Sequence, residues 1–582
     1  MAIGKILTGI GTVAGAYYLG KTLGKAARDR RIEELPVKSK QLTQLCKLNL
    51  AQEGDYANGT AQTPPMGWSS WNAFRNRISE ALVLEIAQAM EKSGLREAGY
   101  QFVNIDDCWQ SSQRDANGRL QADHVTFPSG IPALARRVNA MGLKLGIYSS
   151  NGSLTCEDLP ASLGRESVDA RTFAEWGVEY VKYDFCHNEA VPMRAPCIEK
   201  IAVSALGSGA ERYYGSDDAE LEGGAAVVED ERMESGRYIA GLSYAGGAVC
   251  FPRVYAEEEG DYALTLCIRK KSHSKKFAVI EVNGAVAADT VVPPTWAMTK
   301  EGRHQLLVRL RKGQNSIRIF NPVASRFDSA AYQYTKMGLE LKKASGDYAR
   351  ASGLPEKPIV YSICEWGFHL PWQWGRQAGN LWRTTLDIKP FWASILGIYE
   401  VNVRLFDHAG PGGWNDPDML EVGNGALNFE ENKAHFSLWC MMAAPLILGS
   451  DLRTFLRPDG SPDTANSTYQ IVMNKDLIAI DQDPLGVQCR RISSNLLQDT
   501  LLKPLANGDV ALCFFNKASE SREFSLRMNT VVSKDFVRLP FACAYRAKEL
   551  WSKREETVGD ELQCTVAPHS VKVFRIGPVR EG

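Results

Sequence analysis

The segment Tyr180–Cys186, YVKYDFC, places a lysine and an aspartate within an otherwise apolar stretch that is typical of a buried strand. Residues two apart in a strand share one face, so Lys182, Asp184 and Cys186 are expected to point the same way. A neighbouring ammonium group favours the ionised form of a carboxyl group. The pair is therefore either a positioned carboxylate nucleophile with its lysine or a buried ion pair that is only structural.

Carboxylates also follow other apolar segments of the chain, and tryptophans lie among them. Carboxylates accept hydrogen bonds from hydroxyl groups and aromatic rings cover the apolar face of a pyranose, so this combination is typical of a sugar site. Two further carboxyl groups can supply the acid and base chemistry of glycoside cleavage. The carboxylates are Asp106, Asp107, Glu365, Asp387, Asp416 and Asp418, and the tryptophans are Trp68, Trp71, Trp109, Trp366, Trp382 and Trp414.

Arg383 and Asp387 lie four residues apart in the segment LWRTTLDI. They would share a strand face if the strand continues that far. The main alternative for such an acidic cluster is a metal site. There is no histidine pair at ligand spacing, and carboxylates alone would suit only Mg²⁺ or Ca²⁺. We therefore expect no metal in the catalytic site.

Short apolar segments that end in polar residues alternate with helical segments along much of the chain. The helical segment 79–99 begins at Ser79 and ends near Gly99, with apolar residues at helical spacing. This alternation predicts a parallel sheet buried on both faces. In a barrel of such strands the reactive side chains gather at the carboxyl ends of the strands. The strand segments are FVNIDDCW (102–109), LKLGIYSS (143–150), VEYVKYDFC (178–186) and PIVYSICEWG (358–367).

The pattern changes to short alternating strands separated by Gly, Asn and Asp between about 210 and 344, where YTKMGLELK (334–342) is interpreted as the last strand. This predicts a β-sandwich inserted into the barrel. Antiparallel patterns return after Gly486. The expected division is an N-terminal apolar and basic segment with a linker at 1–60, the barrel at 61–209 and 345–486, the inserted sandwich at 210–344, and a C-terminal antiparallel β domain at 487–582.

Composition limits the class of protein. The chain has 582 residues, a net charge of −1 and 23% charged residues, which predicts a soluble globular protein without a polycationic surface, so nucleic acid is not an expected partner. Thirteen cysteines without a CxxC pair indicate neither a disulfide framework nor a zinc cluster. At most a local bridge is expected.

The N-terminal segment 6–20, ILTGIGTVAGAYYLG, is uncharged and is followed by several Lys and Arg residues. It is shorter than the roughly 20 residues of a membrane span, and basic residues directly after it oppose export. Membrane association or a frayed end, with the rest of the chain in the cytoplasm, is the favoured interpretation. Export through a signal peptide and a simple glycine-rich tail stay open as alternatives.

Taken together, TPPMGWSSWNAF, NIDDCW, KLGIYS, GVEYVKYDFC, IVYSICEWG, LWRTTLDI, GGWNDPDML and MAAPLILGSDLR resemble, in order, the α-galactosidases of glycoside hydrolase family 27. The resemblance covers Thr63–Gly486 without the insert, and the family also has a C-terminal β domain. It implies an α/β fold with a (β/α)8 TIM barrel. It further implies retaining hydrolysis of terminal α-linked D-galactose from oligosaccharides or polysaccharides by double displacement, without a catalytic cofactor.

The resemblance also implies roles for single residues. Asp184 corresponds to the nucleophile and Asp387 to the acid/base, and Lys182 would bind sugar hydroxyls and keep Asp184 ionised. Cys156 and Cys186 match a cysteine pair that commonly forms a disulfide beside the site. The implied substrate-binding residues are Trp71, Asp106, Asp107, Tyr148, Lys182, Glu365, Trp366, Arg383 and Asp418.

Related activities remain as alternatives. α-N-acetylgalactosaminidases carry small residues at the position of Glu365, and β-L-arabinopyranosidases tend to replace one of the aspartates at Asp106 and Asp107 by a bulkier acid, so galactose is favoured. A lectin-like protein on an inactive barrel would tolerate loss of Asp184 and Asp387, and both are present. The natural aglycone and the oligomeric state are left open.

The insert has a resemblance of its own, to carbohydrate-binding modules of the family 6 and 35 type, which often hold a structural calcium ion. It is carried by DDAELEGGAAV, by the segment from GRYIAGL to GDYALTL, and by VNG. Glu220 and Glu222 are the candidate calcium ligands. The alternative is a packing or oligomer-forming domain without a ligand, because a fold alone does not establish binding.

Overall fold

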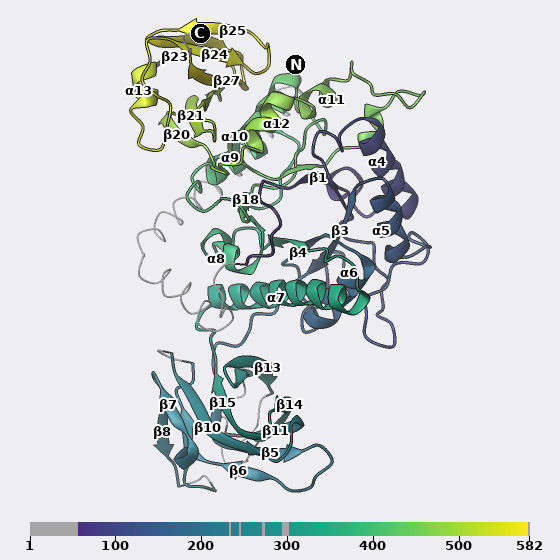
Figure 1. Ribbon diagram of the computed structural model, residues 1–582, viewed down its shortest axis with the longest axis vertical. Helices are drawn as coiled ribbons and strands as arrows, with labels where there is room; N and C mark the ends of the chain where they lie inside the picture. The colour runs from purple at the N-terminus through teal and green to yellow at the C-terminus, as the bar shows by residue number, and fades with distance from the viewer. Residues whose placement is uncertain (1–55, 232–233, 244–245, 270–273, 294–301, 580–582) are drawn as a thin grey trace, which may run out of the picture. The chain divides into compact units, whose positions relative to one another are not determined.

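The computed structural model describes residues 56–231, 234–243, 246–269, 274–293 and 302–579 (Figure 1). These fall into two compact units. The first contains residues 56–188 and 334–579, and the second contains residues 189–333.

The first unit contains a sheet of eight parallel strands in the order β18-β17-β16-β4-β3-β2-β1-β19. A parallel bridge between Leu420 and Leu448 joins the chain just after β18 to β19, so the sheet closes into a barrel. The predicted (β/α)8 barrel is confirmed. Its strands are β1 (Met66–Ser69), β2 (Phe102–Asn104), β3 (Lys144–Ser150), β4 (Tyr180–Asp184), β16 (Val360–Cys364), β17 (Leu381–Arg383), β18 (Trp414–Asp416) and β19 (Leu446–Leu448).

Helices follow the barrel strands and cover them (Figure 1). In α4, Ser79 caps the first turn by accepting a hydrogen bond from the amide of Leu82, and Val83, Ile86 and Met90 are buried at helical spacing. The principal helices are α4 (Glu80–Lys92), α5 (Ile131–Ala140), α6 (Glu166–Trp176), α7 (Arg326–Ser352), α8 (Pro371–Ala378), α9 (Trp392–Asn402), α10 (Phe429–Met441), α11 (Ser467–Val472) and α12 (Lys475–Asp481).

The interpretation of residues 334–342 as a strand was wrong, because they lie within the 27-residue helix α7. Tyr334, Met337 and Leu341 are buried there, whereas Leu339 is 37% exposed. The buried side chains are therefore spaced by three and four residues, as on one face of a helix. The alternation of MGLEL imitates a strand over too few residues to separate the two periods.

The second unit is a β-sandwich with its own apolar core. One sheet has the order β13-β12-β15-β10-β7, and the other has the order β14-β11-β5-β9-β8 with β6 paired to β5. The strands are β5 (Cys197–Ala205), β6 (Arg212–Tyr214), β7 (Glu220–Glu222), β8 (Ala226–Glu229), β9 (Arg237–Ala240), β10 (Ala248–Ala256), β11 (Gly260–Arg269), β12 (Lys276–Val282), β13 (Ala285–Val292), β14 (Gly302–Leu310) and β15 (Gly313–Phe320).

The bounds of this unit differ from the expected 210–344. Strand β5 pairs along its length with β11 and so belongs to the sandwich, and the compact unit runs from Glu189 to Gln333. The carboxylate of Glu222 lies 2.9 Å from the guanidinium of Arg318. Calcium binding by Glu220 and Glu222 therefore rests on the family resemblance alone.

The C-terminal part of the first unit is antiparallel, as predicted. A six-stranded sheet with the order β20-β21-β22-β27-β24-β25 accompanies the pair β23-β26. The elements are β20 (Arg490–Ser494), β21 (Gln498–Pro504), β22 (Val510–Asn516), β23 (Arg522–Arg527), α13 (Met528–Val532), β24 (Tyr545–Glu549), β25 (Glu555–Val558), β26 (Glu561–Val566) and β27 (Ser570–Pro578).

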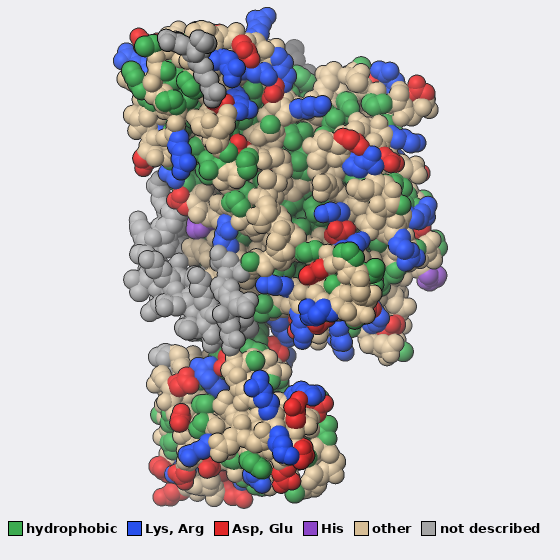
Figure 2. Space-filling view, viewed as in Figure 1, with side chains coloured by type: hydrophobic (Ala, Val, Ile, Leu, Met, Phe, Trp, Pro, Cys, Tyr) green, Lys and Arg blue, Asp and Glu red, His purple; other side chains and the backbone are tan. Residues whose placement is uncertain are grey.

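Lys and Arg side chains are interspersed with Asp and Glu side chains on the face of the molecule that Figure 2 shows. Among the described residues, no helix is both long enough and apolar enough to span a membrane. The apolar segment 6–20 lies outside the described residues.

Candidate active site

A pocket lies at the carboxyl ends of the barrel strands and gathers residues that are far apart in the sequence. Most of the side chains that the sequence pointed to line it. These are Trp71, Asp106, Asp107, Tyr148, Cys156, Lys182, Asp184, Trp366, Arg383, Asp387 and Asp418.

The parallel register brings the two carboxylates nearest to Lys182 together. Lys182 Nζ lies 2.8 Å from Asp106 Oδ2 and 3.9 Å from Asp184 Oδ2, and 5.2 Å from the centre of the Tyr148 ring. The lysine is therefore shared, and Asp106 is its closer partner. This position suits a cation that holds two carboxylates in one orientation.

The expectation that Lys182 keeps Asp184 ionised holds only in part. Burial raises the pKa of Asp184 to about 6; the ammonium of Lys182 acts in the opposite direction, and the carboxylate of Asp387 adds to the increase. Asp184 is thus mostly ionised above about pH 6 and protonated below it. The amide of Phe185 donates a 2.8 Å hydrogen bond to Asp184 Oδ1 and fixes the direction of the carboxyl group.

Arg383 pairs with two further carboxylates of the pocket. One guanidinium nitrogen, Nη2, lies 2.8 Å from Asp418 Oδ2 and 3.1 Å from Asp387 Oδ1. Strand β17 ends at Arg383, so a shared strand face does not bring Asp387 to the arginine; the loop that follows does.

The charge state of Asp387 follows from that contact. Burial raises its pKa, but the charges of Arg383 and Lys182 outweigh this and hold the pKa below the ordinary value. The Asp387 side chain is 55% exposed, in contrast to the 7% of Asp184. In this arrangement Asp387 is a carboxylate near neutral pH, which suits a base better than an acid.

Glu365 is not brought to the pocket with the other residues. Its carboxylate accepts a 2.9 Å hydrogen bond from the backbone amide of His369 and lies 3.0 Å from His369 Nδ1. Trp366, the next residue, lines the pocket instead. Both residues follow the end of β16 at Cys364, and Trp366 has a φ of 59°, so the turn after the strand rather than strand alternation decides which side chain enters the pocket.

The expected disulfide joins Cys156 to Cys186, and so ties the loop after β3 to the end of β4 beside Asp184. The Tyr148 hydroxyl donates a 3.3 Å hydrogen bond to Cys156 Sγ. Cys108 is a free cysteine. Within the part of the chain that the structure describes, no other disulfide is present.

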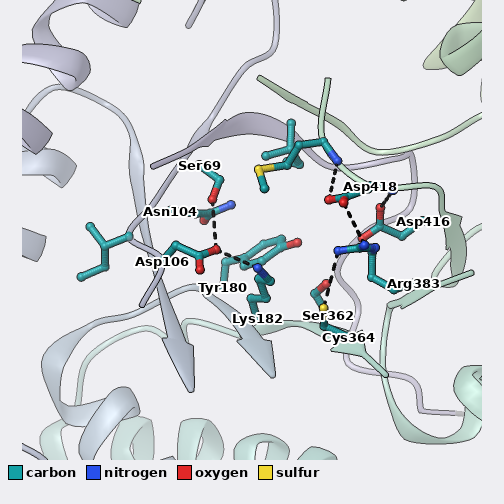
Figure 3. A pocket seen from close by; sticks show the side chains of 13 residues that line it. Ser69, Asn104, Asp106, Tyr180, Lys182, Ser362, Cys364, Arg383, Asp416 and Asp418 are labelled. Atoms are coloured by element: carbon teal, nitrogen blue, oxygen red, sulfur yellow. Dashed lines mark hydrogen bonds and ion pairs between the residues drawn. The ribbon is translucent and has the colours of Figure 1, made fainter. Parts of the chain in front are cut away.

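Polar side chains continue below the pocket into the barrel interior, which in most barrels is filled by branched apolar residues (Figure 3). Asp416, which the sequence placed in the acidic cluster without a role, lies here beside Arg383, and burial raises its pKa. Within the described residues, Asn104 Oδ1 and Arg383 Nε lack a hydrogen-bond partner. The residues labelled in Figure 3 are Ser69, Asn104, Asp106, Tyr180, Lys182, Ser362, Cys364, Arg383, Asp416 and Asp418.

Backbone strain is also concentrated at the pocket. Arg75, Trp366 and Asp418 line it with φ of 52°, 59° and 84°, in the left-handed region that non-glycine residues rarely adopt. Such strain persists only where the surrounding structure enforces it, and it is common at ligand sites.

The sequence reasoning missed several lining residues, which are Asn72, Arg75, Ile388, Lys389, Met419 and Glu421. Each lies within four residues of Trp71, Asp387 or Asp418. Loops after the same strand ends carry them, so closeness to a predicted residue was the available signal.

The family model described as alpha galactosidase A matches residues 63–212 and 326–483, and a second model, the alpha galactosidase C-terminal beta sandwich domain, matches residues 498–576. The chain belongs to the alpha-galactosidase family, glycoside hydrolase family 27. The first family model leaves residues 213–325 unmatched, and these residues contain most of the inserted sandwich.

Individual relatives agree with this assignment. The family member is 30% identical to an alpha-galactosidase of Cyamopsis tetragonoloba over 90% of this chain and 88% of that protein. It is 30% identical to alpha-galactosidase A of Cellvibrio japonicus over 89% of this chain and 93% of that protein. Among solved structures, alpha-galactosidase I of Mortierella vinacea has a TM-score of 0.61 at 25% identity and covers 90% of this chain and 100% of its own.

Proposed function

We propose that this chain hydrolyses terminal α-linked D-galactose from galactosides by a retaining double displacement, with Asp184 as nucleophile and Asp387 as acid/base. The observation that carries the proposal is one pocket at the strand ends that contains both carboxyl groups, Asp184 beside Lys182 and Asp387 beside Arg383, among aromatic rings and further carboxylates. Retaining glycoside hydrolysis uses such a pair of carboxyl groups, one as nucleophile and one as acid/base.

In the first step, Asp184 attacks the anomeric carbon and forms a glycosyl ester, while Asp387 protonates the leaving oxygen. Asp387 must therefore take up a proton that its contact with Arg383 opposes. A sugar hydroxyl that accepts a hydrogen bond from Arg383 would compete with Asp387 for the guanidinium and so weaken the contact that lowers the Asp387 pKa. The bound sugar would also exclude water from around Asp387, and this desolvation would raise the Asp387 pKa further. In the second step Asp387 removes a proton from water, whose oxygen attacks the anomeric carbon, so that the ester to Asp184 breaks and galactose is released.

The remaining pocket residues bind the sugar in this proposal. Asp106, Asp107 and Asp418 accept hydrogen bonds from hydroxyl groups, and Lys182 and Arg383 donate them. Trp71, Tyr148 and Trp366 supply aromatic surface. Asp106 and Asp107 together favour galactose over an arabinopyranoside. Glu365 does not line the pocket, and in this proposal it supports the pocket wall through its contacts with His369. Carbohydrate binding by the insert is a separate proposal, which rests on its resemblance to binding modules.

The test uses nitrophenyl α-D-galactoside and NMR of the first-formed sugar. The parent should release galactose with retained anomeric configuration, and Asp184→Asn should lose at least about a hundredfold in rate. Asp387→Asn should keep much of the first step on this good leaving group and should respond to azide.

Inversion of the anomeric configuration would contradict the double-displacement mechanism. Full activity in a folded Asp184→Asn protein would contradict the assignment of Asp184 as nucleophile. Both variants should be compared with the parent by circular dichroism, so that misfolding is not mistaken for lost chemistry.

A further inference from the structure

One carboxylate of the acidic cluster, Asp416, has no part in the proposed chemistry. It is the last residue of β18 and lines the polar cavity below the pocket, but not the pocket itself. Figure 3 shows it on the same side of this cavity as Arg383 and Asp418. A carboxyl group is costly to keep away from bulk water unless it has partners, so the contacts of Asp416 indicate what it does.

The first contact of Asp416 is with the backbone two residues later. Its Oδ1 accepts a 2.8 Å hydrogen bond from the amide of Asp418. This spacing defines an Asx turn, in which a side-chain oxygen takes the place of a backbone carbonyl. Asp418 has a φ of 84°, which non-glycine residues rarely adopt. The bond from Asp416 therefore supports the strained conformation of Asp418.

The conformation of Asp418 matters because its carboxyl group holds the surroundings of Asp387. Asp418 Oδ2 lies 2.8 Å from Arg383 Nη2 and accepts a 2.9 Å hydrogen bond from the amide of Ile388. The same arginine nitrogen lies 3.1 Å from Asp387, and Ile388 is the next residue in the chain. Asp418 thus fixes both the charged partner and the backbone of Asp387.

The second contact of Asp416 is with strand β17. Asp416 is paired with Arg383 in the parallel register, and its carbonyl accepts a 2.9 Å hydrogen bond from the amide of Thr384. Burial lowers the pKa of Arg383, but the acidic groups around it, Asp418 foremost and Asp416 among them, raise that pKa well above its ordinary value. Asp416 therefore also helps to keep the guanidinium charged and in place at the start of the loop that carries Asp387.

The nucleophile is held by other groups. The amide of Phe185 donates a hydrogen bond to Asp184, and the ammonium of Lys182 lies 3.9 Å from its carboxylate. Asp416 makes neither of these contacts. A change at Asp416 should therefore reach Asp387 before it reaches Asp184.

We propose that Asp416 is a positioning residue for Asp387, the proposed acid/base. It acts through Asp418, whose strained backbone it supports, and not through contact with the sugar. The inference rests on the proposed function, because it concerns the residue that protonates the leaving oxygen there. Its specific consequence is that loss of the turn at Asp416 impairs proton donation more than sugar binding or attack.

The test compares two substrates that differ in their need for an acid. Nitrophenol leaves with little protonation, whereas methanol must receive a proton in the transition state. The value of kcat/KM for nitrophenyl α-D-galactoside therefore reports sugar binding and attack, and the value for methyl α-D-galactoside also reports proton donation. Asp387→Asn is the reference and should lose far more activity on the methyl galactoside.

Three variants separate the turn from the charge. Asp416→Ala removes both. Asp416→Asn keeps an oxygen that accepts from the amide of Asp418 but removes the charge. Asp416→Glu keeps the charge, but its longer side chain displaces the carboxylate from that amide, and the adjoining cavity leaves space for the extra methylene group.

In Asp416→Ala and Asp416→Glu, kcat/KM for the methyl galactoside should fall at least about tenfold more than kcat/KM for the nitrophenyl galactoside, because the acid is no longer held within reach of the leaving oxygen. Asp416→Asn should keep the ratio of the two values within about threefold of that of the parent, because the turn persists. Asp416→Glu carries the test if Asp416→Ala does not fold.

Asp459→Ala is the matched control. Asp459 is exposed outside the pocket, and its Oδ1 accepts the same kind of hydrogen bond, at 2.9 Å from the amide of Ser461. Both kcat/KM values should equal those of the parent in this variant.

An equal fall on both substrates in Asp416→Ala and Asp416→Glu would show that Asp416 is only structural and would overturn the inference. No fall in either variant, or an Asp416→Asn protein as selectively impaired as Asp416→Ala, would overturn it as well. A parent that cleaves neither substrate, or an Asp387→Asn protein without the selective loss, would instead refute the proposed function, and the inference with it.

Discussion

At the scale of single residues, Lys182 contacts two carboxylates of the pocket and affects the pKa of Asp184. Its ammonium pairs at 2.8 Å with Asp106 and reaches Asp184 at 3.9 Å, and the surrounding carboxylates outweigh burial and raise its own pKa well above the ordinary value. The lysine therefore stays charged and limits how far burial can raise the pKa of Asp184.

This gives a pH prediction. The proposed nucleophile, Asp184, must be ionised to react, so activity should fall as the pH drops through about 6, the pKa of this residue. Lys182→Met removes the charge that lowers this pKa, and the acidic limb of kcat/KM should move upward by about one pH unit or more. The pH profile is measured on the nitrophenyl galactoside, where the position of the limb is independent of the reduced maximum.

Lys144→Met is the matched control, because Lys144 lies at the opposite, amino end of the barrel strand β3. Its profile should coincide with that of the parent. An acidic limb that stays in place in Lys182→Met would show that another group controls the ionisation seen in the profile.

At the scale of elements, a buried ionic network joins helix α9 to the C-terminal sheet. Asp499 of β21 is buried and accepts a 2.8 Å hydrogen bond from the Tyr399 hydroxyl, and its carboxylate lies 3.1 Å from Arg491 and 3.0 Å from Lys517. Glu400 of α9 contacts both cations as well. The C-terminal sheet is thus fixed to the barrel by charge as well as by apolar contact.

Asp499→Asn should destabilise this unit by about 3 kcal/mol, because it removes one partner of a buried ion pair and leaves two cations with a single carboxylate. Urea unfolding of the full chain, followed by tryptophan fluorescence, measures the change. Glu520→Gln, which breaks an exposed pair with Arg522, should cost less than about 1 kcal/mol. Equal costs for the two variants would argue against a structural role for the network.

At the scale of the whole molecule, the sandwich interrupts the barrel between β4 and α7. The two ends of the second unit are close, because Gln333 Nε2 donates a 2.9 Å hydrogen bond to the carbonyl of Glu189. Tyr334, the first residue after the unit, belongs to α7, and its hydroxyl donates a 3.0 Å hydrogen bond to the carbonyl of Asp184. The junction therefore follows closely after Asp184, the proposed nucleophile, in the sequence, and the residue that ends it contacts the Asp184 carbonyl.

Two deletions should separate the alternative boundaries. Removing 189–333 and closing the gap with a short Gly/Ser linker should keep the rate on the nitrophenyl galactoside within about tenfold, because the barrel strands and the part of α7 from Tyr334 onward, with its buried face, remain. Removing 210–344 should abolish folding or activity, because it deletes Tyr334, Met337 and Leu341 and leaves β5 without its partner β11. Equal activity of both deletion proteins would mean that the start of α7 is dispensable.

The sequence by itself predicted the parallel sheet and the C-terminal β domain from its periodicity, and the eight-stranded barrel and most of the pocket from its resemblance to glycoside hydrolase family 27. The alternation of strands with helices is a local pattern, and the face to which Asp184 and Lys182 point follows from the two-residue period of a strand. The carboxyl end of each barrel strand is then the expected place for its polar residues. These inferences needed no knowledge of which strands are neighbours.

Only the tertiary structure showed which charged side chains contact one another and which strands are paired. Lys182 lies closer to Asp106 than to Asp184, Glu365 turns to His369, and Asp387 reaches Arg383 through a loop. The strand β5 joins the sandwich because of its pairing with β11. Strand register and loop conformation result from many weak contacts between residues that are distant in the sequence. A local sequence pattern therefore does not specify which charged groups lie together or how their pKa values shift.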